Sequence, residues 1–193
     1  MLLAEAGMDE GSRFAVMVGV CIDDPSLITD RLTDGGDGGV VEVLRDVAFA
    51  TRISFASKRQ LGSEGRDWPF VLVANVVRYH WSPDRPRCPV IAHAREGGPF
   101  DVEWSDAFFT NQSYGPVRVR TEIHHRDDRL LLIAETVARI VQAALEDDPD
   151  RPSAARERYD VLAPFVSLED VGANVTHGRG VTADELVRMT VRT

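Results

Sequence analysis

The stretch Pro116-Val-Arg-Val-Arg-Thr-Glu-Ile-His-His125 alternates between apolar and polar side chains and leads into a long apolar segment. The alternation predicts a strand, because successive side chains of a strand point to opposite faces. From Asp128 to Glu146, apolar residues recur at helical spacing. Asp127 and Asp128 are residue types that cap a helix start and complement its dipole. A strand followed directly by a helix indicates an α/β architecture.

The predicted helix 128–146 is apolar over more of its surface than one sheet needs. Its main stripe contains Leu130, Ile133, Val137, Ile140, Val141 and Ala144, and it is widened by Leu131, Leu132, Ala134, Ala138 and Leu145. We therefore expect a second cover, supplied either by extra segments of this chain or by a neighbouring subunit. The charged face of the strand would lie beside it. The residues that we assign to a subunit interface are Arg118, Arg120, Glu122, His124, Leu131, Leu132 and Leu145.

The fold class predicted is α+β: a small mixed or antiparallel sheet packed against two main helices, at about 40–51 and 128–146. The 193 residues fit one domain. We place it at 36–193, with a proline-rich loop at 82–99. Residues 1–35 are expected to form a partly flexible N-terminal extension, disordered over its first twelve residues.

Weaker patterns predict the remaining elements. Asp23-Asp-Pro-Ser26 marks the start of a short helix that ends near Leu32. The other expected segments are a flexible loop at 34–39, strands at 53–56, 68–79 and 100–104, a short helix at 153–163, a loop at 171–180 and a closing strand at 186–192.

Composition excludes several classes of protein. The net charge of −9 argues against a general nucleic-acid binder. No run of about 18 apolar residues predicts a membrane span, and the acidic N-terminus is unlike a signal peptide, so we expect an intracellular protein. Cys21 and Cys88 are interpreted as idle thiols, because a zinc site usually needs four clustered ligands.

Two polar clusters resemble sites but have simpler explanations. His124 and His125 next to Asp127 and Asp128 offer metal ligands or a general base. Adjacent strand residues point to opposite faces, however, so a strand end and a helix cap explain them better. The second cluster contains Asp101, Glu103 and Asp106, which fit the solvent face of an amphipathic strand better than acid–base catalysis.

The other motifs also lack a recognisable chemistry. The glycines at 35–39 have neither a phosphate-loop signature nor G-x-G-x-x-G, and no G-x-S-x-G occurs. The aromatic residues Trp68, Trp81, Trp104, Phe108 and Phe109 are interpreted as core and interface. The arginines 118, 120 and 126 are better explained by ion pairs than by phosphate binding. We therefore predict no catalytic, metal-binding or cofactor-binding residue, and no enzyme.

The second half of the chain resembles the tail terminator, or tail-completion, proteins of long-tailed bacteriophages. The likeness rests on a helix before Asp67-Trp-Pro-Phe-Val71, a charged strand at 117–125, a helix at 128–146, and a closing strand preceded by a small polar patch, together at 182–192. It covers residues 40–193 in outline. The chain departs from the family pattern in its N-terminal segment, its proline-rich loop and residues 147–180.

The resemblance implies a structural virion protein, located in the tail or neck and assembled in the host cytoplasm. Such a protein forms a homo-oligomeric, hexameric ring that ends the tail tube and joins it to the head connector. Its partners would be itself, the tail tube protein and connector proteins, with no cofactor, no sequence-specific nucleic acid and no membrane. The alternatives are another head-to-tail connector or stopper, or a cytosolic α/β enzyme or ligand-binding domain. The site of that last alternative would lie near Trp104, Phe108, Tyr114 and His124.

Overall fold

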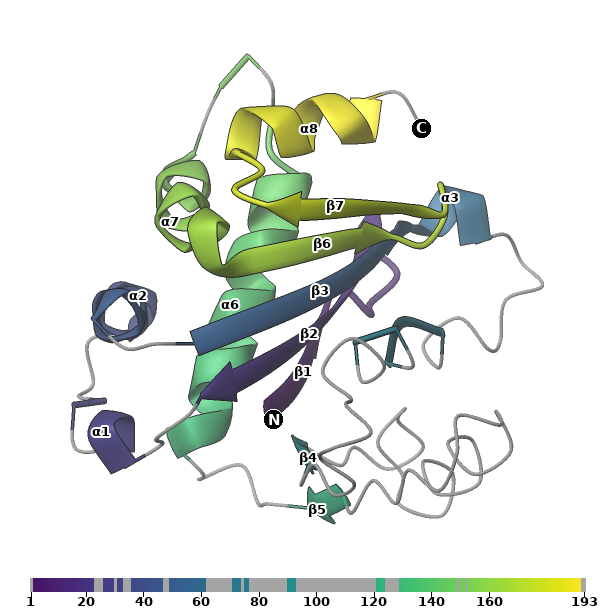
Figure 1. Cartoon of the computed structure of the whole chain (residues 1–193). Helices are drawn as coiled ribbons and strands as arrows, with labels where there is room; N and C mark the ends of the chain where they lie inside the picture. Colours follow the sequence, from purple (N-terminus) through teal and green to yellow (C-terminus); the bar gives the residue numbers. More distant parts are fainter. Residues whose placement is uncertain are drawn as a thin grey trace.

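The fold is α+β, as predicted, and its sheet is mixed (Figure 1). The computed structural model describes residues 2–22, 26–29, 31–32, 36–46, 49–61, 71–73, 75–76, 90–92, 121–123, 129–148, 150–151 and 153–191. The strands are β1 (Leu2–Ala6), β2 (Phe14–Ile22), β3 (Phe49–Ser57), β4 (Val90–Ala92), β5 (Thr121–Ile123), β6 (Val166–Asp170) and β7 (Val175–Arg179). The helices are α1 (Ser26–Thr29), α2 (Gly36–Arg45), α3 (Lys58–Leu61), α6 (Arg129–Leu145), α7 (Ala154–Leu162) and α8 (Ala183–Val191), with a 3-10 turn η1 at Ala163–Phe165.

The described strands form one sheet in the order β5-β4-β1-β2-β3-β6-β7. β1, β2 and β3 pair antiparallel, as do β6 and β7. The pairs β1–β4, β4–β5 and β3–β6 are parallel. Within this part of the chain, β5 and β7 therefore lie at the two edges of the sheet.

The N-terminal segment is not a flexible extension. β1 and β2 lie in the middle of the sheet, and Leu2, Leu3 and Ala4 are all buried. A tight turn joins the two strands, because Gly7 has a φ of 70° and Asp9 Oδ1 accepts hydrogen bonds from the backbone N–H groups of Gly11 and Ser12, both at 3.0 Å. β1 was missed because it has only five residues, too few for a clear alternation.

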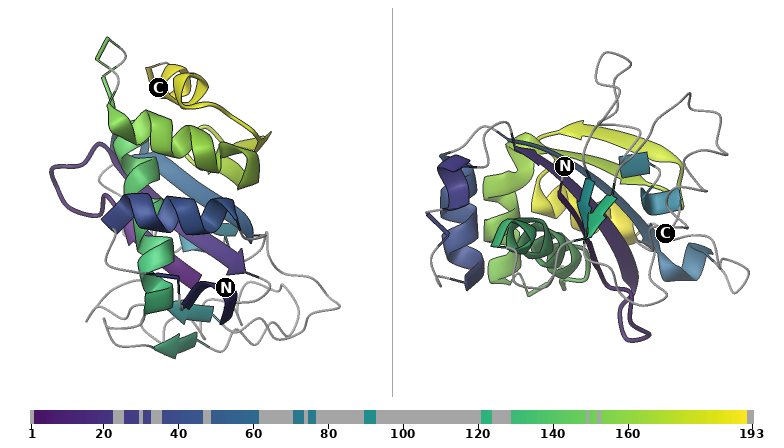
Figure 2. Two further views of the ribbon diagram at one scale, coloured as in Figure 1. Left: turned by 90° about the vertical axis from the view of Figure 1, so that its left-hand side faces the viewer. Right: turned by 90° about the horizontal axis from the view of Figure 1, so that it is seen from below.

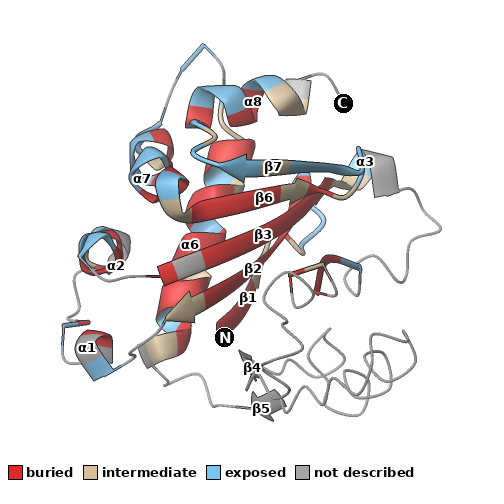
Figure 3. Ribbon diagram, viewed as in Figure 1, coloured by how far each residue is buried: buried red, intermediate tan, exposed pale blue. Residues whose placement is uncertain are grey.

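Helix α6 forms the centre of the core. It packs on β1 and β2 and also contacts α2, α7 and α8 (Figures 1 and 2). Its buried residues are Leu131, Ile133, Ala134, Thr136, Val137, Ala138, Ile140, Val141, Ala144 and Leu145. The predicted second cover therefore comes from this chain itself, whose buried segments surround α6 in Figure 3. The helix length was predicted correctly to within one residue at each end.

The bounds or the type of several expected elements differ from the structure. The helix expected at 40–51 begins earlier, at Gly36, and gives way to β3 at Phe49, so residues 36–39 are helical and not a loop. Residues 71–73 and 75–76 are helical where a strand was expected. The proline-rich loop contains β4, and the loop expected at 171–180 contains β7.

The closing segment is a helix and not a strand. Thr182 and Glu185 form a reciprocal cap at the start of α8: Glu185 Oε2 accepts from Thr182 N at 2.9 Å, and Thr182 Oγ1 accepts from Glu185 N at 3.3 Å. This is the capping-box pattern of a helix start, and it outweighs the alternation at 186–192. The helix predicted at 153–163 is confirmed as α7, with Tyr159 and Leu162 buried. The strand predicted at 53–56 and the start of the helix after Pro25 are also confirmed.

A buried arginine joins the C-terminal helices. Arg156 of α7 lies 2.5 Å from Asp147 Oδ2 and 3.0 Å from Asp184 Oδ1, and it donates to the carbonyl of Asp148 at 2.7 Å. Burial raises the pKa of the Asp147 carboxyl, but hydrogen bonds from Ser153 and Arg156 outweigh it, so the pKa lies below its ordinary value. The ion pair thus fixes the α6–α7 connection against α8.

We expect Gly7→Ala to destabilise the protein by about 1–3 kcal/mol. A Cβ at Gly7 would lie 2.0 Å from the carbonyl oxygen of Phe14, on a backbone with φ 70°. The matched control is Gly38→Ala in α2, where a Cβ would meet nothing within 4 Å. There, better helix propensity predicts a gain of about 0.5–1 kcal/mol at most. Urea unfolding measures both changes, and equal effects of the two substitutions would contradict the assigned turn.

The Asp147–Arg156 pair predicts a loss of stability in acid. Because the folded pKa of Asp147 is lowered, its contribution is complete above about pH 4, the ordinary aspartate range, and is lost as the pH falls through the folded pKa. Asp147→Asn should therefore flatten the fall in unfolding free energy below about pH 4. Chemical denaturation at a series of pH values tests this, with Asp150→Asn in the same connection as the control. An unchanged slope in Asp147→Asn would count against the ion pair.

Candidate functional site

The residues assigned to a subunit interface from the sequence fall into three groups. Arg118, Arg120 and His124 lie outside the described residues, as do the histidine–aspartate and aromatic clusters considered above. Glu122 lies in β5, at the edge of the sheet. Leu132 is 38% exposed on α6, whereas Leu131 and Leu145 are buried within the chain. Those two leucines pack in the protein's own core, so assigning them to an interface was wrong.

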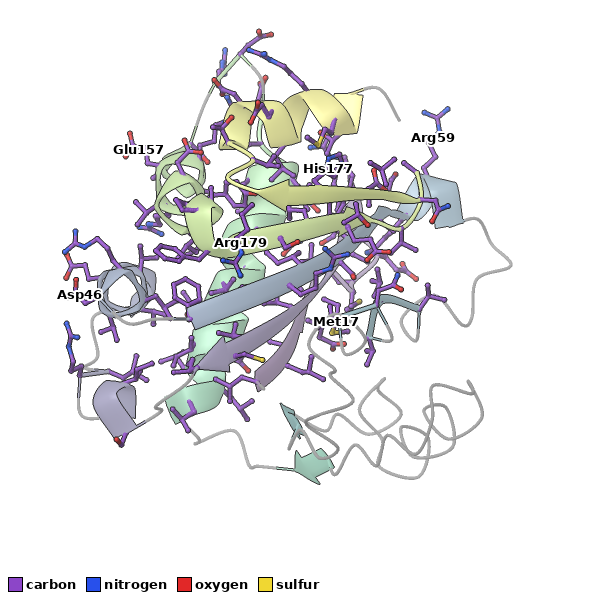
Figure 4. The ribbon with its side chains drawn as sticks, viewed as in Figure 1. Met17, Asp46, Arg59, Glu157, His177 and Arg179 are labelled. Atoms are coloured by element: carbon purple, nitrogen blue, oxygen red, sulfur yellow. The ribbon has the colours of Figure 1, made fainter. Side chains whose placement is uncertain are left out.

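β5 and β7 are the edge strands of the described sheet. β5 pairs only with β4, and β7 pairs only with β6, among the described strands. β7 is exposed along most of its length, including Val175, which is 42% exposed. Its basic residues His177 and Arg179 are labelled in Figure 4. An edge strand presents backbone hydrogen-bonding groups that another chain can pair with.

A second feature is a polar face on the central strands, opposite α6. The strand register places Leu3, Gly19, Arg52 and Ser167 in one row across β1, β2, β3 and β6. The next row contains Glu5, Met17, Ser54 and Glu169. Side chains in these rows point away from the α6 core, which takes the alternate residues Val18, Ile53 and Leu168.

Arg52 is the centre of this face, and it is only 3% exposed. Its Nη1 donates to Ser167 Oγ at 2.8 Å and to the Leu168 carbonyl at 3.5 Å. Its Nη2 forms an ion pair with Glu169, whose side chain is 18% exposed. The pair therefore links β3 to β6 through a charge that has been removed almost completely from water.

Ser54 lies two residues along β3 from Arg52 and is completely buried. Among the described residues, no hydrogen-bond partner lies near its Oγ. Thr51 has an equally unsatisfied hydroxyl on the opposite face of the same strand. A buried hydroxyl without a partner costs about 1–3 kcal/mol. Only Ser54 combines this cost with a neighbouring buried ion pair.

The sequence did not point to Arg52, Ser54, Ser167 or Glu169. The pattern Thr51-Arg-Ile-Ser54 alternates, and a polar alternate face is normally interpreted as solvent-facing. The signal that was available is Arg52, the one charged residue in Phe49–Ser57, a strand that β2 and β6 flank. Recognising it requires knowledge of the strand order.

A shallow groove of about 250 Å³ lies between α2 and α7. Its floor includes Gly38, Val41 and Val161, and its rim carries the charged residues Glu42, Arg45, Glu157 and Arg158. Figure 4 labels Glu157 at α7. The groove is open, and its mixed charges favour no particular ligand.

The described ranges contain neither a candidate metal site nor a helix that could span a membrane. There, no group of three or more His, Cys, Asp or Glu side chains is placed to hold a metal ion. No described helix is both long and apolar enough to cross a membrane. Comparison with protein families, with curated proteins and with solved structures found no match to this chain.

We expect Glu169→Gln to destabilise the protein by about 1–3 kcal/mol, because it removes the carboxylate that pairs with the buried Arg52. The control is Glu135→Gln, which affects an exposed ion pair to Arg139 with a separation of 4.0 Å. That change should cost less than about 0.5 kcal/mol. Urea unfolding of both variants tests the difference, and similar costs would show that Arg52 does not depend on Glu169.

Proposed function

We propose that this chain is a structural protein that assembles with copies of itself through the edges of its sheet. The observation that carries the proposal is the position of β5, the strand on which the sequence predicts a charged subunit interface. Thr121–Ile123 is the outermost described strand on its side of the sheet, and β4 is its one partner among the described strands. An interface on this strand needs no rearrangement of the described core.

The opposite edge carries residues of complementary charge. β5 contains Glu122, and β7 contains His177 and Arg179. Contact between the β5 edge of one copy and the β7 edge of the next would be head-to-tail. Head-to-tail contacts generate a closed ring when the rotation between neighbours closes.

We further propose that this assembly is a tail terminator ring, a hexamer that ends the tail tube of a long-tailed phage and meets the head connector. The charged strand followed by α6 and the net charge of −9 support this proposal. An acidic ring suits a passage through which DNA slides without binding phosphates. Another connector or stopper protein of the same neck fits these features as well. The closing segment, helical here, no longer contributes to the resemblance.

The proposal predicts a closed oligomer in native mass spectrometry and sedimentation. Glu122→Arg should shift this oligomer to smaller species, because both contacting edges would then carry positive charge, at a cost of about 0.2–1 kcal/mol per contact. A second substitution that makes β7 acidic, Arg179→Glu, should restore the assembly. The control is Glu157→Arg on α7, exposed and distant from both edges, which should leave the oligomer unchanged.

Two results would contradict this proposal. One is a wild-type protein that stays monomeric at its highest soluble concentration. The other is an oligomer that survives Glu122→Arg but dissociates in the α7 control.

A further inference from the structure

The buried polar face around Arg52 has no role in ring assembly, because it lies on the middle strands and not at an edge. Figure 1 views the sheet from this face, with α6 behind the strands. Its members are distributed over β1, β2, β3 and β6, which are the best-connected strands of the fold. A rigid sheet of this kind holds side chains in fixed positions, as a binding site requires.

Stability alone does not explain the ion pair at this face. Arg52 is 3% exposed, and taking a guanidinium out of water costs several kcal/mol. A pair of apolar side chains of similar volume would often stabilise a core as well or better. The adjacent Ser54 adds a buried hydroxyl without a partner among the described residues. The Ser54 hydroxyl thus has a cost that the described contacts do not recover.

The geometry suggests which chemistry the face would recognise. A guanidinium and a hydroxyl two residues apart on one strand face are both donors, and together they match the two oxygens of a carboxylate. Glu169 already shows that the guanidinium accepts a carboxylate. Its side chain is the more exposed partner, at 18% compared with 4% for Arg52, so it is the one that can move toward solvent.

We propose that this face binds a small carboxylate-bearing molecule, whose carboxylate replaces Glu169 on Arg52 and accepts a hydrogen bond from Ser54. Replacement keeps the charge balance of the buried guanidinium, because one carboxylate leaves as another enters. It also gives the Ser54 hydroxyl the acceptor that it lacks among the described residues. Arg179, in register with Ser167 on the neighbouring strand β7, adds an exposed cation at the end of the same row.

The two unsatisfied hydroxyls of β3 provide a matched pair of variants. Ser54→Ala removes the hydroxyl on the polar face, and Thr51→Val removes the one on the α6 face. Both variants should fold with an unchanged or higher unfolding midpoint, since each loses a buried group that has no described partner. They differ only in which face of the strand they alter.

The experiment titrates the full-length protein with succinate, and separately with inorganic phosphate, by calorimetry and by NMR of the arginine side-chain N–H groups. Succinate should bind saturably and shift the Arg52 resonance. Ser54→Ala should weaken this binding about tenfold, the effect of losing one hydrogen bond to a charged group, while Thr51→Val should leave it unchanged.

Three outcomes would overturn the proposal. The first is the absence of saturable succinate binding. The second is an equal effect of Ser54→Ala and Thr51→Val. The third is saturable binding of phosphate but not of succinate, which would reject a carboxylate as the ligand.

Discussion

The packing of α6 across β1 and β2 is the contact on which the other elements depend. Ten of its side chains are buried, on faces that meet the sheet, α2, α7 and α8. Burying each large apolar side chain contributes about 1.5–3 kcal/mol relative to leaving it exposed. Because α6 touches both the N-terminal hairpin and the C-terminal helices, it joins segments that are distant in sequence.

Polar contacts at the C-terminal end of α6 hold the helix in one alignment with the β1–β2 hairpin. Glu146 accepts hydrogen bonds from the backbone of Arg13 at 3.0 Å and of Phe14 at 3.4 Å, and the carbonyl of Glu146 accepts from the Arg13 guanidinium at 2.6 Å. Gln142 donates to Ser12 Oγ at 2.8 Å. The β1–β2 turn is therefore attached to the helix end. Apolar burial brings the hairpin and helix together, and these bonds fix which part of the hairpin meets the last helical turns.

The parts of the fold that could be predicted from the sequence are those with long and unambiguous periodicity. The helix at 128–146 has several turns of one pattern, and Tyr159 and Leu162 mark the inner side of α7. Short apolar runs were misjudged. Leu72, Val73 and Val76 are buried at helical spacing, while Val71 is 41% exposed, yet a run rich in valine also fits a strand. At 186–192 the alternation predicted a strand, although the sequence also contains Thr182 and Glu185, which form a helix cap.

The candidate sites depend on strand order, which local pattern does not supply. Glu122 could be assigned to a charged strand, but only the pairing of β5 with β4 places it at an edge. Arg52 and Glu169 are 117 residues apart and meet because β3 and β6 run parallel.

The excess apolar surface of α6 was visible in the sequence, but the sequence did not show what covers it. It was consistent with a neighbouring subunit or with the chain's own segments, and the chain's own helices cover it. The subunit contact that we propose would therefore use surfaces outside this core, and the edge strands β5 and β7 of the described sheet meet that condition without exposing any buried residue of α6.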